Sequence, residues 1–340
     1  MKKAIAFAVA GALAAGVTLT AQTVQINGAG ATFPYPIYSK WFSEYNKLHS
    51  NIQINYQSIG SGGGIQQVTK ETVFFGASDG PMNDEQLKAA PGPILHFPTV
   101  LGGVVPVYNI PGVSAELKFT GALLADIYMG KVIKWNDPAI SKLNPGVMLP
   151  ATEITVVHRS DGSGTTYIWV DYLSKVSPEF KTKVGVNTAV NWPVGVGGKG
   201  NEGVSGLVTQ SPGSIGYVEL IYALQNKISY GSVQNAAGEF VKASVPAVTA
   251  AAAGAATSMP ADFRVSITNA PGKGVYPISS FTWLLLYESP KDKAQAKVMV
   301  EFVKWALTDG QKFCAALGYA PLPASVVKLE MAALEKIKLS

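Results

Sequence analysis

The chain has 340 residues, of which 47% are apolar and only 14% are charged, so it can bury a large core and is not a disordered protein. Its 35 Gly and 21 Pro follow no three-residue period, and no longer repeat is visible, which excludes collagen-like and solenoid chains. One Cys cannot form an internal disulfide, and three scattered His cannot build a local zinc site. We therefore expect a loop-rich globular protein of two lobes, without a metal or other cofactor.

The first 21 residues have the pattern of a secretory signal peptide. Lys2 and Lys3 precede an uncharged run that ends near Ala21. We predict cleavage after Ala21 and, with no Cys nearby, no lipid anchor. The alternative is an uncleaved membrane anchor, for which the run is short because a bilayer span takes roughly 20 residues. Without these two lysines the formal net charge of +5 becomes +3. The sequence has no cluster of Lys and Arg, so it gives no indication of nucleic-acid binding.

From residue 24 onward, short apolar runs alternate with Gly/Ser/Thr-rich turns and amphipathic stretches, which is typical of an α/β protein. Apolar residues recur at helical spacing in 34–48, 165–176 and 294–308, and each segment is predicted to be a helix. A helix is also expected at 65–71, after a Gly-rich run, and at the Ala-rich stretch 247–256, where a linker is the alternative. The predicted strands are 24–27, 52–56, 73–77, 104–109, 154–158 and 275–287.

Two segments have the character of connections between lobes. Residues 97–103 follow a Pro/Gly-rich turn, and the long apolar run 275–287 follows another turn. If both connect the same pair of lobes, the two ends of the chain form one lobe and the middle forms the other. The predicted division is residues 22–98 with 275–340 as lobe I and residues 99–274 as lobe II.

Three segments place Gly and small hydroxyl residues directly before a predicted helix. They are 29–33 (AGATF), 60–64 (GSGGG) and 161–166 (DGSGTT). A helix start offers unpaired main-chain N–H groups and the positive end of the helix dipole, and Gly lets an anion approach the backbone. One such segment alone favours simple capping. Three of them, one beside the planar guanidinium of Arg159, indicate a site for a tetrahedral or carboxylate anion.

Nucleotide binding and serine hydrolysis are the competing functions. Gly follows both Gly-Lys pairs, at 198–199 and 272–273, where a Walker loop needs Ser or Thr, and Phe33 replaces the third Gly of a Rossmann loop. The sequence contains no G-x-S-x-G elbow, so a hydrolase would have to use Ser163 with His158 as its base. Nucleotide binding is therefore disfavoured, and a secreted phosphoester or serine hydrolase remains an alternative.

Two carboxylates, Asp79 and Asp161, lie beside these segments, where they would repel an anion. Arg159 can neutralise Asp161 and be held in place by it. Asp79 has no obvious cation, and an ionised carboxylate can only accept hydrogen bonds. Such an acceptor suits an anion that still carries a proton, as hydrogen phosphate does and sulfate at neutral pH does not.

Six ordered motifs lie between about residue 24 and about residue 330: 28–34 (GAGATFP), 56–63 (YQSIGSGG), 75–79 (FGASD), 130–137 (GKVIKWND), 161–165 (DGSGT) and 213–219 (GSIGYVE). Together they are similar to the motifs of the periplasmic phosphate-binding proteins of bacterial high-affinity phosphate ABC importers. The resemblance implies an α/β fold of the two-lobe periplasmic-binding-protein type II, with two hinge crossings and the ligand in the interlobe cleft. It implies a monomer in the periplasm that binds inorganic phosphate, in its hydrogen and dihydrogen forms, and delivers it to the transmembrane permease subunits of an ATP-driven importer. No enzymatic step and no nucleic acid are implied.

Matching these motifs position by position implies nine phosphate-binding residues. Asp79 corresponds to the acceptor carboxylate, and the residues from Arg159 onward correspond to the clamp of the second lobe. The chain departs from the family pattern at His158, where a second basic residue is expected, and at Gly62. The same fold binding another oxyanion, such as sulfate or molybdate, is the closer alternative. The implied binding residues are Thr32, Phe33, Ser61, Asp79, Arg159, Asp161, Ser163, Gly164 and Thr165.

Overall fold

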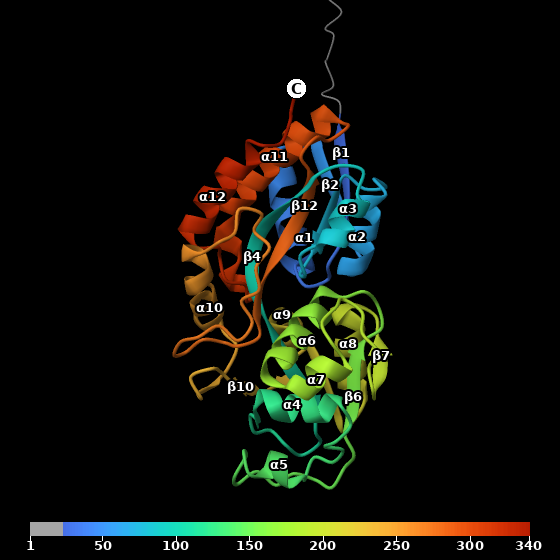
Figure 1. Ribbon diagram of the computed structural model, residues 1–340, viewed down its shortest axis with the longest axis vertical. Coiled ribbons are helices and arrows are strands. Elements are labelled where there is room, and N and C mark those ends of the chain that lie inside the picture. The colour runs from blue at the N-terminus through green and yellow to red at the C-terminus, as the bar shows by residue number, and fades with distance from the viewer. Residues whose placement is uncertain (1–22) are drawn as a thin grey trace, which may run out of the picture.

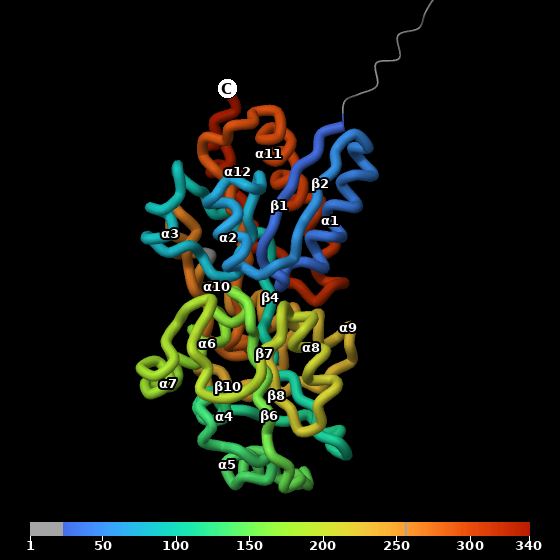
Figure 2. The backbone as a smooth tube through the Cα atoms, turned by 90° about the vertical axis from the view of Figure 1, so that its right-hand side faces the viewer, coloured from blue at the N-terminus to red at the C-terminus, as the bar shows by residue number. Residues whose placement is uncertain are grey.

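The computed structural model describes residues 23–340 and arranges them in two lobes, stacked along the long axis of the molecule (Figure 1). The strand β4 (Ile94–Asn109) runs from one lobe into the other, as Figure 2 shows from the side. The predicted signal peptide, residues 1–21, lies outside the described residues. The two-lobe α/β architecture expected from the sequence is confirmed.

Lobe I is a mixed sheet in the order β2-β1-β3-β12-β4, in which β1 pairs in parallel with β2 and β3, and β12 runs antiparallel to its neighbours. Its strands are β1 (Val24–Gly30), β2 (Ile52–Ser58), β3 (Phe75–Ser78), β12 (Ser279–Tyr287) and the first part of β4. Its helices are α1 (Tyr35–Leu48), α2 (Ser61–Thr69), α3 (Asp84–Ala89), α11 (Lys293–Leu307) and α12 (Ala324–Leu334), with the 3-10 turns Asp309–Phe313 and Ala315–Leu317.

Lobe II continues the sheet in the order β4-β8-β6-β7 and adds a small second sheet. Its strands are β6 (Thr155–Arg159), β7 (Val196–Gly198), β8 (Ser214–Glu219) and β9 (Ser229–Tyr230), and the small sheet contains β5 (Lys118–Phe119), β10 (Ser232–Gln234) and β11 (Phe240–Val241). Its helices are α4 (Gly121–Tyr128), α5 (Pro138–Ser141), α6 (Gly164–Val176), α7 (Pro178–Lys183), α8 (Gly200–Gln210) and α9 (Leu220–Gln225). The helix α10 (Val245–Thr257) packs on β4, β12 and α12.

The two lobes share β4, which changes its pairing partner in the middle. Residues up to Gly103 pair with β12, and residues from Val104 onward pair with β8. At this point the N–H of Val104 also donates to the carbonyl oxygen of Ile278, just before β12, at 2.8 Å. The predicted crossings 97–103 and 275–287 therefore lie side by side. The predicted division into 22–98 with 275–340 and 99–274 stays a prediction.

The helices predicted from apolar spacing are confirmed with ends that differ by at most one residue, as α1, α6 and α11. On α1 the apolar face is aromatic, and Tyr38, Trp41 and Tyr45 are buried in the lobe I core. The Ala-rich stretch is the helix α10, in which the Ser244 hydroxyl accepts the N–H of Ala247 as an N-cap.

The prediction for the Gly-rich run was wrong in one respect. The helix α2 starts at Ser61 rather than at residue 65, so the glycines form its first turn. A side chain on Gly64 would place a Cβ atom 2.5 Å from the Cα of Gly30 and 2.7 Å from the carbonyl oxygen of Ala77. Glycine is used here because the helix lies directly against β1 and β3, although Gly is a poor helix former.

Candidate functional site

The lobe I part of the site lies where its strands end. Thr32 and Phe33 follow β1, Ser61 begins the helix after β2, and Asp79 follows β3 directly. The carboxyl ends of neighbouring parallel strands meet at one sheet edge, so these residues come together. All four are buried, and the Ser61 hydroxyl accepts the main-chain N–H of Asp79 at 3.1 Å.

The lobe II part is built around Arg159, the last residue of β6. Its Nε donates to Asp161 Oδ1 at 2.8 Å and its Nη2 to Asp161 Oδ2 at 2.6 Å, while Nη1 lies 3.3 Å from Thr165 Oγ1. The expected pairing of Arg159 with Asp161 is thus present. Burial raises the pKa of Asp161, but the hydrogen bonds and charge of Arg159 and the N–H of Gly200 outweigh it, and the pKa is lowered. Asp161 is therefore ionised near neutral pH and holds the guanidinium.

The remaining lobe II residues begin α6. The Ser163 hydroxyl caps this helix by accepting the N–H of Thr166 at 3.0 Å, and Gly164 and Thr165 form its first turn. A side chain on Gly164 would put a Cβ atom 2.6 Å from the Cβ of Asp79, which belongs to the other lobe. Only glycine fits this position while the lobes are closed.

The two halves of the site touch across the interlobe boundary. The N–H of Gly62 donates to the carbonyl oxygen of Gly162 at 2.9 Å, and Tyr222 donates its hydroxyl to the carbonyl oxygen of Thr32 at 2.6 Å. The structure therefore describes the closed arrangement of the lobes. It brings the nine residues implied by the resemblance to one place.

Unpaired main-chain donors lie on both sides of this boundary. Within residues 23–340 no hydrogen-bond acceptor is found for several N–H groups that lie before or within the first turns of α1, α2 and α6. Unpaired N–H groups in a buried place are costly unless a ligand accepts from them. Because they belong to both lobes, an anion between the lobes could accept hydrogen bonds from both sides. Among them are the N–H groups of Thr32, Phe33, Ser61, Gly164 and Thr165.

Asp79 is the unusual group of the site, since it is 1% exposed and forms no ion pair within the described residues. Thr282, on β12, donates its hydroxyl to Asp79 Oδ1 at 2.7 Å. Burial raises the pKa of Asp79 to about 7, although the Thr282 hydrogen bond, the charge of Arg159 and the Ser61 hydroxyl each lower it. The carboxyl group therefore changes protonation close to neutral pH.

Sequence reasoning missed two residues of this network, Thr282 and Asn201. Thr282 stands alone in an apolar strand, and its only signal was a hydroxyl residue within a buried run. Asn201 is the second residue of α8, after the segment Lys199-Gly200, and it is fully buried. This segment has the same strand, Gly and helix order as the three predicted ones but lacks Ser and Thr. That order was the signal that could have identified it.

The serine hydrolase arrangement is not formed. The His158 ring stacks on Trp192, with ring centroids 5.3 Å apart, and its Nδ1 lies 3.0 Å from the carbonyl oxygen of Arg159. The Ser163 hydroxyl is used as a helix cap, as described above. These two side chains form no hydrogen bond with each other, so the nucleophile has no base beside it.

Two other features are absent from residues 23–340. No group of three or more His, Cys, Asp or Glu side chains could hold a metal ion. No helix in the same residues has the length and apolar character that a membrane span requires.

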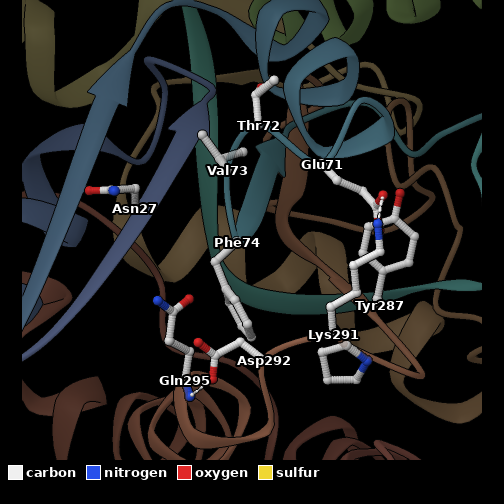
Figure 3. Close-up of a pocket in the computed structure, with 10 residues that line it drawn as sticks. Asn27, Glu71, Thr72, Val73, Phe74, Tyr287, Lys291, Asp292 and Gln295 are labelled. Carbon is white, nitrogen blue, oxygen red and sulfur yellow. Dashed lines mark hydrogen bonds and ion pairs between the residues drawn. The ribbon is translucent and has the colours of Figure 1, made fainter.

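A separate pocket of about 260 Å³ lies in lobe I, away from the interlobe boundary (Figure 3). Its charged side chains already have partners: Lys291 pairs with Glu71 at 2.5 Å, and Asp292 caps α11 by accepting the N–H of Gln295 at 2.9 Å. None of the predicted site residues lines this pocket. It is therefore not part of the anion site.

Comparisons with known proteins agree with this architecture. The PBP superfamily domain matches residues 16–309. Among solved structures, a high-affinity periplasmic phosphate-binding protein bound with phosphate superposes with a TM-score of 0.71 at 22% identity, covering 91% of this chain and 93% of that one. A phosphate-binding protein from Stenotrophomonas maltophilia gives a TM-score of 0.70 at 18% identity, covering 91% and 94%. These structures share the fold.

Similarity to curated proteins is much higher. The phosphate-binding protein PstS of Xylella fastidiosa (strain Temecula1) is 53% identical over 309 residues, which cover 90% of this chain and 84% of that protein. PstS of Pasteurella multocida is 49% identical, covering 91% and 90%. With this identity over nearly the whole length, and with the superfamily domain matching most of the chain, the protein belongs to the PstS family of phosphate-binding proteins.

Proposed function

We propose that this protein binds inorganic phosphate between its closing lobes and delivers it to the membrane permease of an ATP-driven importer. The unpaired main-chain N–H groups at the interlobe boundary, among them those of Thr32, Ser61 and Gly164, carry this proposal, because a buried donor set of this kind needs an acceptor. Arg159 and Asp161 together are neutral, so hydrogen bonds rather than net positive charge would hold the anion. The curated relatives are named phosphate-binding proteins, in agreement with this ligand.

Among the nine implied residues, different chemical groups would make different contacts with the phosphate. Thr32, Ser61, Ser163 and Thr165 would supply hydroxyl donors together with the free N–H groups, Arg159 would supply a charged donor held by Asp161, and Asp79 would accept the proton of the ligand. Closure of the lobes would remove water from these contacts and stabilise the liganded form. We expect the protein to act as a monomer and without an enzymatic step.

Isothermal titration calorimetry with inorganic phosphate and with sulfate tests the ligand directly. We expect phosphate to bind at one site per chain and sulfate to compete poorly at pH 8. Equal affinity for sulfate or molybdate would instead favour the other oxyanion alternative. Release of phosphate from a chromogenic ester, abolished by Ser163→Ala, would overturn the assignment as a binding protein.

Export to the periplasm is the further part of this proposal, and it depends on the sequence of residues 1–21. N-terminal sequencing of the protein from the periplasmic fraction of its native cell should begin near Gln22. A chain that begins at Met1 in the cytoplasmic fraction would contradict export.

A further inference from the structure

A single amide side chain joins hydroxyl groups of both lobes. Asn201, at the start of α8 in lobe II, donates from Nδ2 to Thr32 Oγ1 of lobe I at 2.8 Å and lies 3.2 Å from Thr165 Oγ1 of lobe II. Its main-chain N–H also approaches Thr32 Oγ1, at 3.3 Å. All three residues are buried. Asn201 thus contacts two of the implied binding residues without being one of them.

The orientation of this amide is fixed by its other end. Asn201 Oδ1 accepts the main-chain N–H of Glu219 at 3.0 Å. A main-chain N–H can only donate, so the carbonyl oxygen of the amide must face Glu219 and the NH₂ group must face the two threonines.

These contacts determine what each threonine hydroxyl can do. A hydroxyl group has one proton to donate and two lone pairs that accept. On Thr32 both lone pairs face donors of Asn201, and on Thr165 they face Asn201 Nδ2 and Arg159 Nη1. The remaining hydrogen-bonding capacity of each hydroxyl is its own proton.

We propose that Asn201 is a positioning residue of the anion site, which fixes the hydroxyls of Thr32 and Thr165 as donors toward bound phosphate. This inference rests on the proposed function. It also gives a second reason, besides Asp79 itself, why the site would select phosphate over sulfate. If these hydroxyls cannot accept the proton of the ligand, that proton must go to a carboxylate. Because Thr32 and Thr165 belong to different lobes, the same amide also forms its full set of hydrogen bonds only when the lobes are closed.

The test compares phosphate affinity in two Asn201 variants with a matched buried asparagine of lobe II. Asn201→Ala leaves the threonine hydroxyls free to rotate, and we expect affinity to fall about 10- to 100-fold, since each neutral hydrogen bond is modest. Asn201→Asp places an acceptor where the donor was, which turns both hydroxyls away from the ligand, and we expect a larger loss at pH 8. Asn144→Ala removes an amide that bonds only to main-chain groups of Lys118 and Ile140, and it should leave affinity unchanged.

Two readouts separate orientation from a general structural effect. Protonation of the carboxyl introduced by Asn201→Asp restores a donor, so its affinity relative to wild type should recover as the pH falls from 8 to 5. In a background carrying Thr32→Val and Thr165→Val, Asn201→Ala should cost little further affinity, because the hydroxyls through which it acts are gone.

The outcomes also distinguish this inference from the proposed function. If the wild type binds no phosphate, the proposed function fails. If the wild type binds phosphate and Asn201→Ala binds it equally well, or if Asn201→Ala costs the same in the double-valine background, the positioning inference fails alone. If Asn201→Ala does not fold, the comparison of Asn201→Asp with wild type across pH decides the matter: a constant ratio overturns the inference.

Discussion

Sulfate binding should depend on pH through Asp79. The structure raises the pKa of this buried carboxyl to about 7, and the main cause is desolvation of its charged form. A rise of this size corresponds to about 4 kcal/mol of disfavoured ionisation. Hydrogen phosphate relieves the cost of this buried charge by donating its proton to the Asp79 carboxylate, whereas sulfate has no proton to donate at neutral pH. At pH 8, about one unit above this pKa, sulfate binding must first protonate Asp79 and should be weakened about tenfold relative to its affinity below the pKa, whereas phosphate brings the proton itself.

The sign of the pH dependence follows from the same group. Below its pKa, Asp79 carries a proton and can donate to a sulfate oxygen, so sulfate binds without repulsion. Above the pKa, sulfate binding must take up one proton, and its affinity should fall about tenfold for each pH unit. Phosphate should be much less sensitive, because either the ligand or Asp79 can bring the required proton.

Titration calorimetry of sulfate and phosphate from pH 6 to pH 9, on wild type and on Asp79→Asn, measures both effects. The asparagine side chain donates as well as accepts and does not titrate in this range. Asp79→Asn should therefore bind sulfate with little pH dependence and should narrow the phosphate-to-sulfate ratio. Sulfate affinity that is independent of pH in the wild type, or an unchanged ratio in the variant, would refute this account of Asp79.

Three further predictions concern the clamp, closure and stability. Arg159→Ala leaves the charge of Asp161 uncompensated and should weaken phosphate binding by about 3 to 5 kcal/mol. Thr165→Ala should weaken it by only about 0.5 to 1.5 kcal/mol. Calorimetry that gives the reverse order would contradict the assignment of Arg159 to the site. Small-angle scattering should show a smaller radius of gyration with saturating phosphate; an unchanged radius together with an unchanged melting temperature would contradict closure around the ligand. Burial raises the pKa of Glu330 well above its usual value, and neither of its carboxyl oxygens has a hydrogen-bond partner within the described residues. The folded state therefore binds this proton more tightly than the unfolded chain, and that contribution to stability is lost as the pH rises toward the raised pKa. The melting temperature of Glu330→Gln should equal that of wild type near pH 4 and lie a few degrees above it near pH 8. A difference in melting temperature that does not change with pH would contradict this role of Glu330.

The sequence alone determined the local elements and the kind of ligand. Helical spacing of apolar residues located α1, α6 and α11, because a helix repeats its buried face over a few turns of adjacent sequence. Gly and hydroxyl residues before or in the first turn of three helices indicated an oxyanion for the same reason, since unpaired N–H groups at a helix start are a local property. The contact of Arg159 with Asp161 was also predictable, as the two residues are neighbours on one strand end.

Only the tertiary structure decided which distant residues meet. It makes one strand, β4, pair with β12 in one half and β8 in the other, which joins the lobes. It also sets the environment of Asp79. Burial raises the pKa of this carboxyl and the hydroxyl of Thr282 lowers it, and Thr282 lies far from Asp79 in the sequence. Asn201 reaches Thr32 across 169 positions of sequence. Apolar periodicity and loop composition carry no information on such pairings, because they depend on how the sheets pair and how the lobes close.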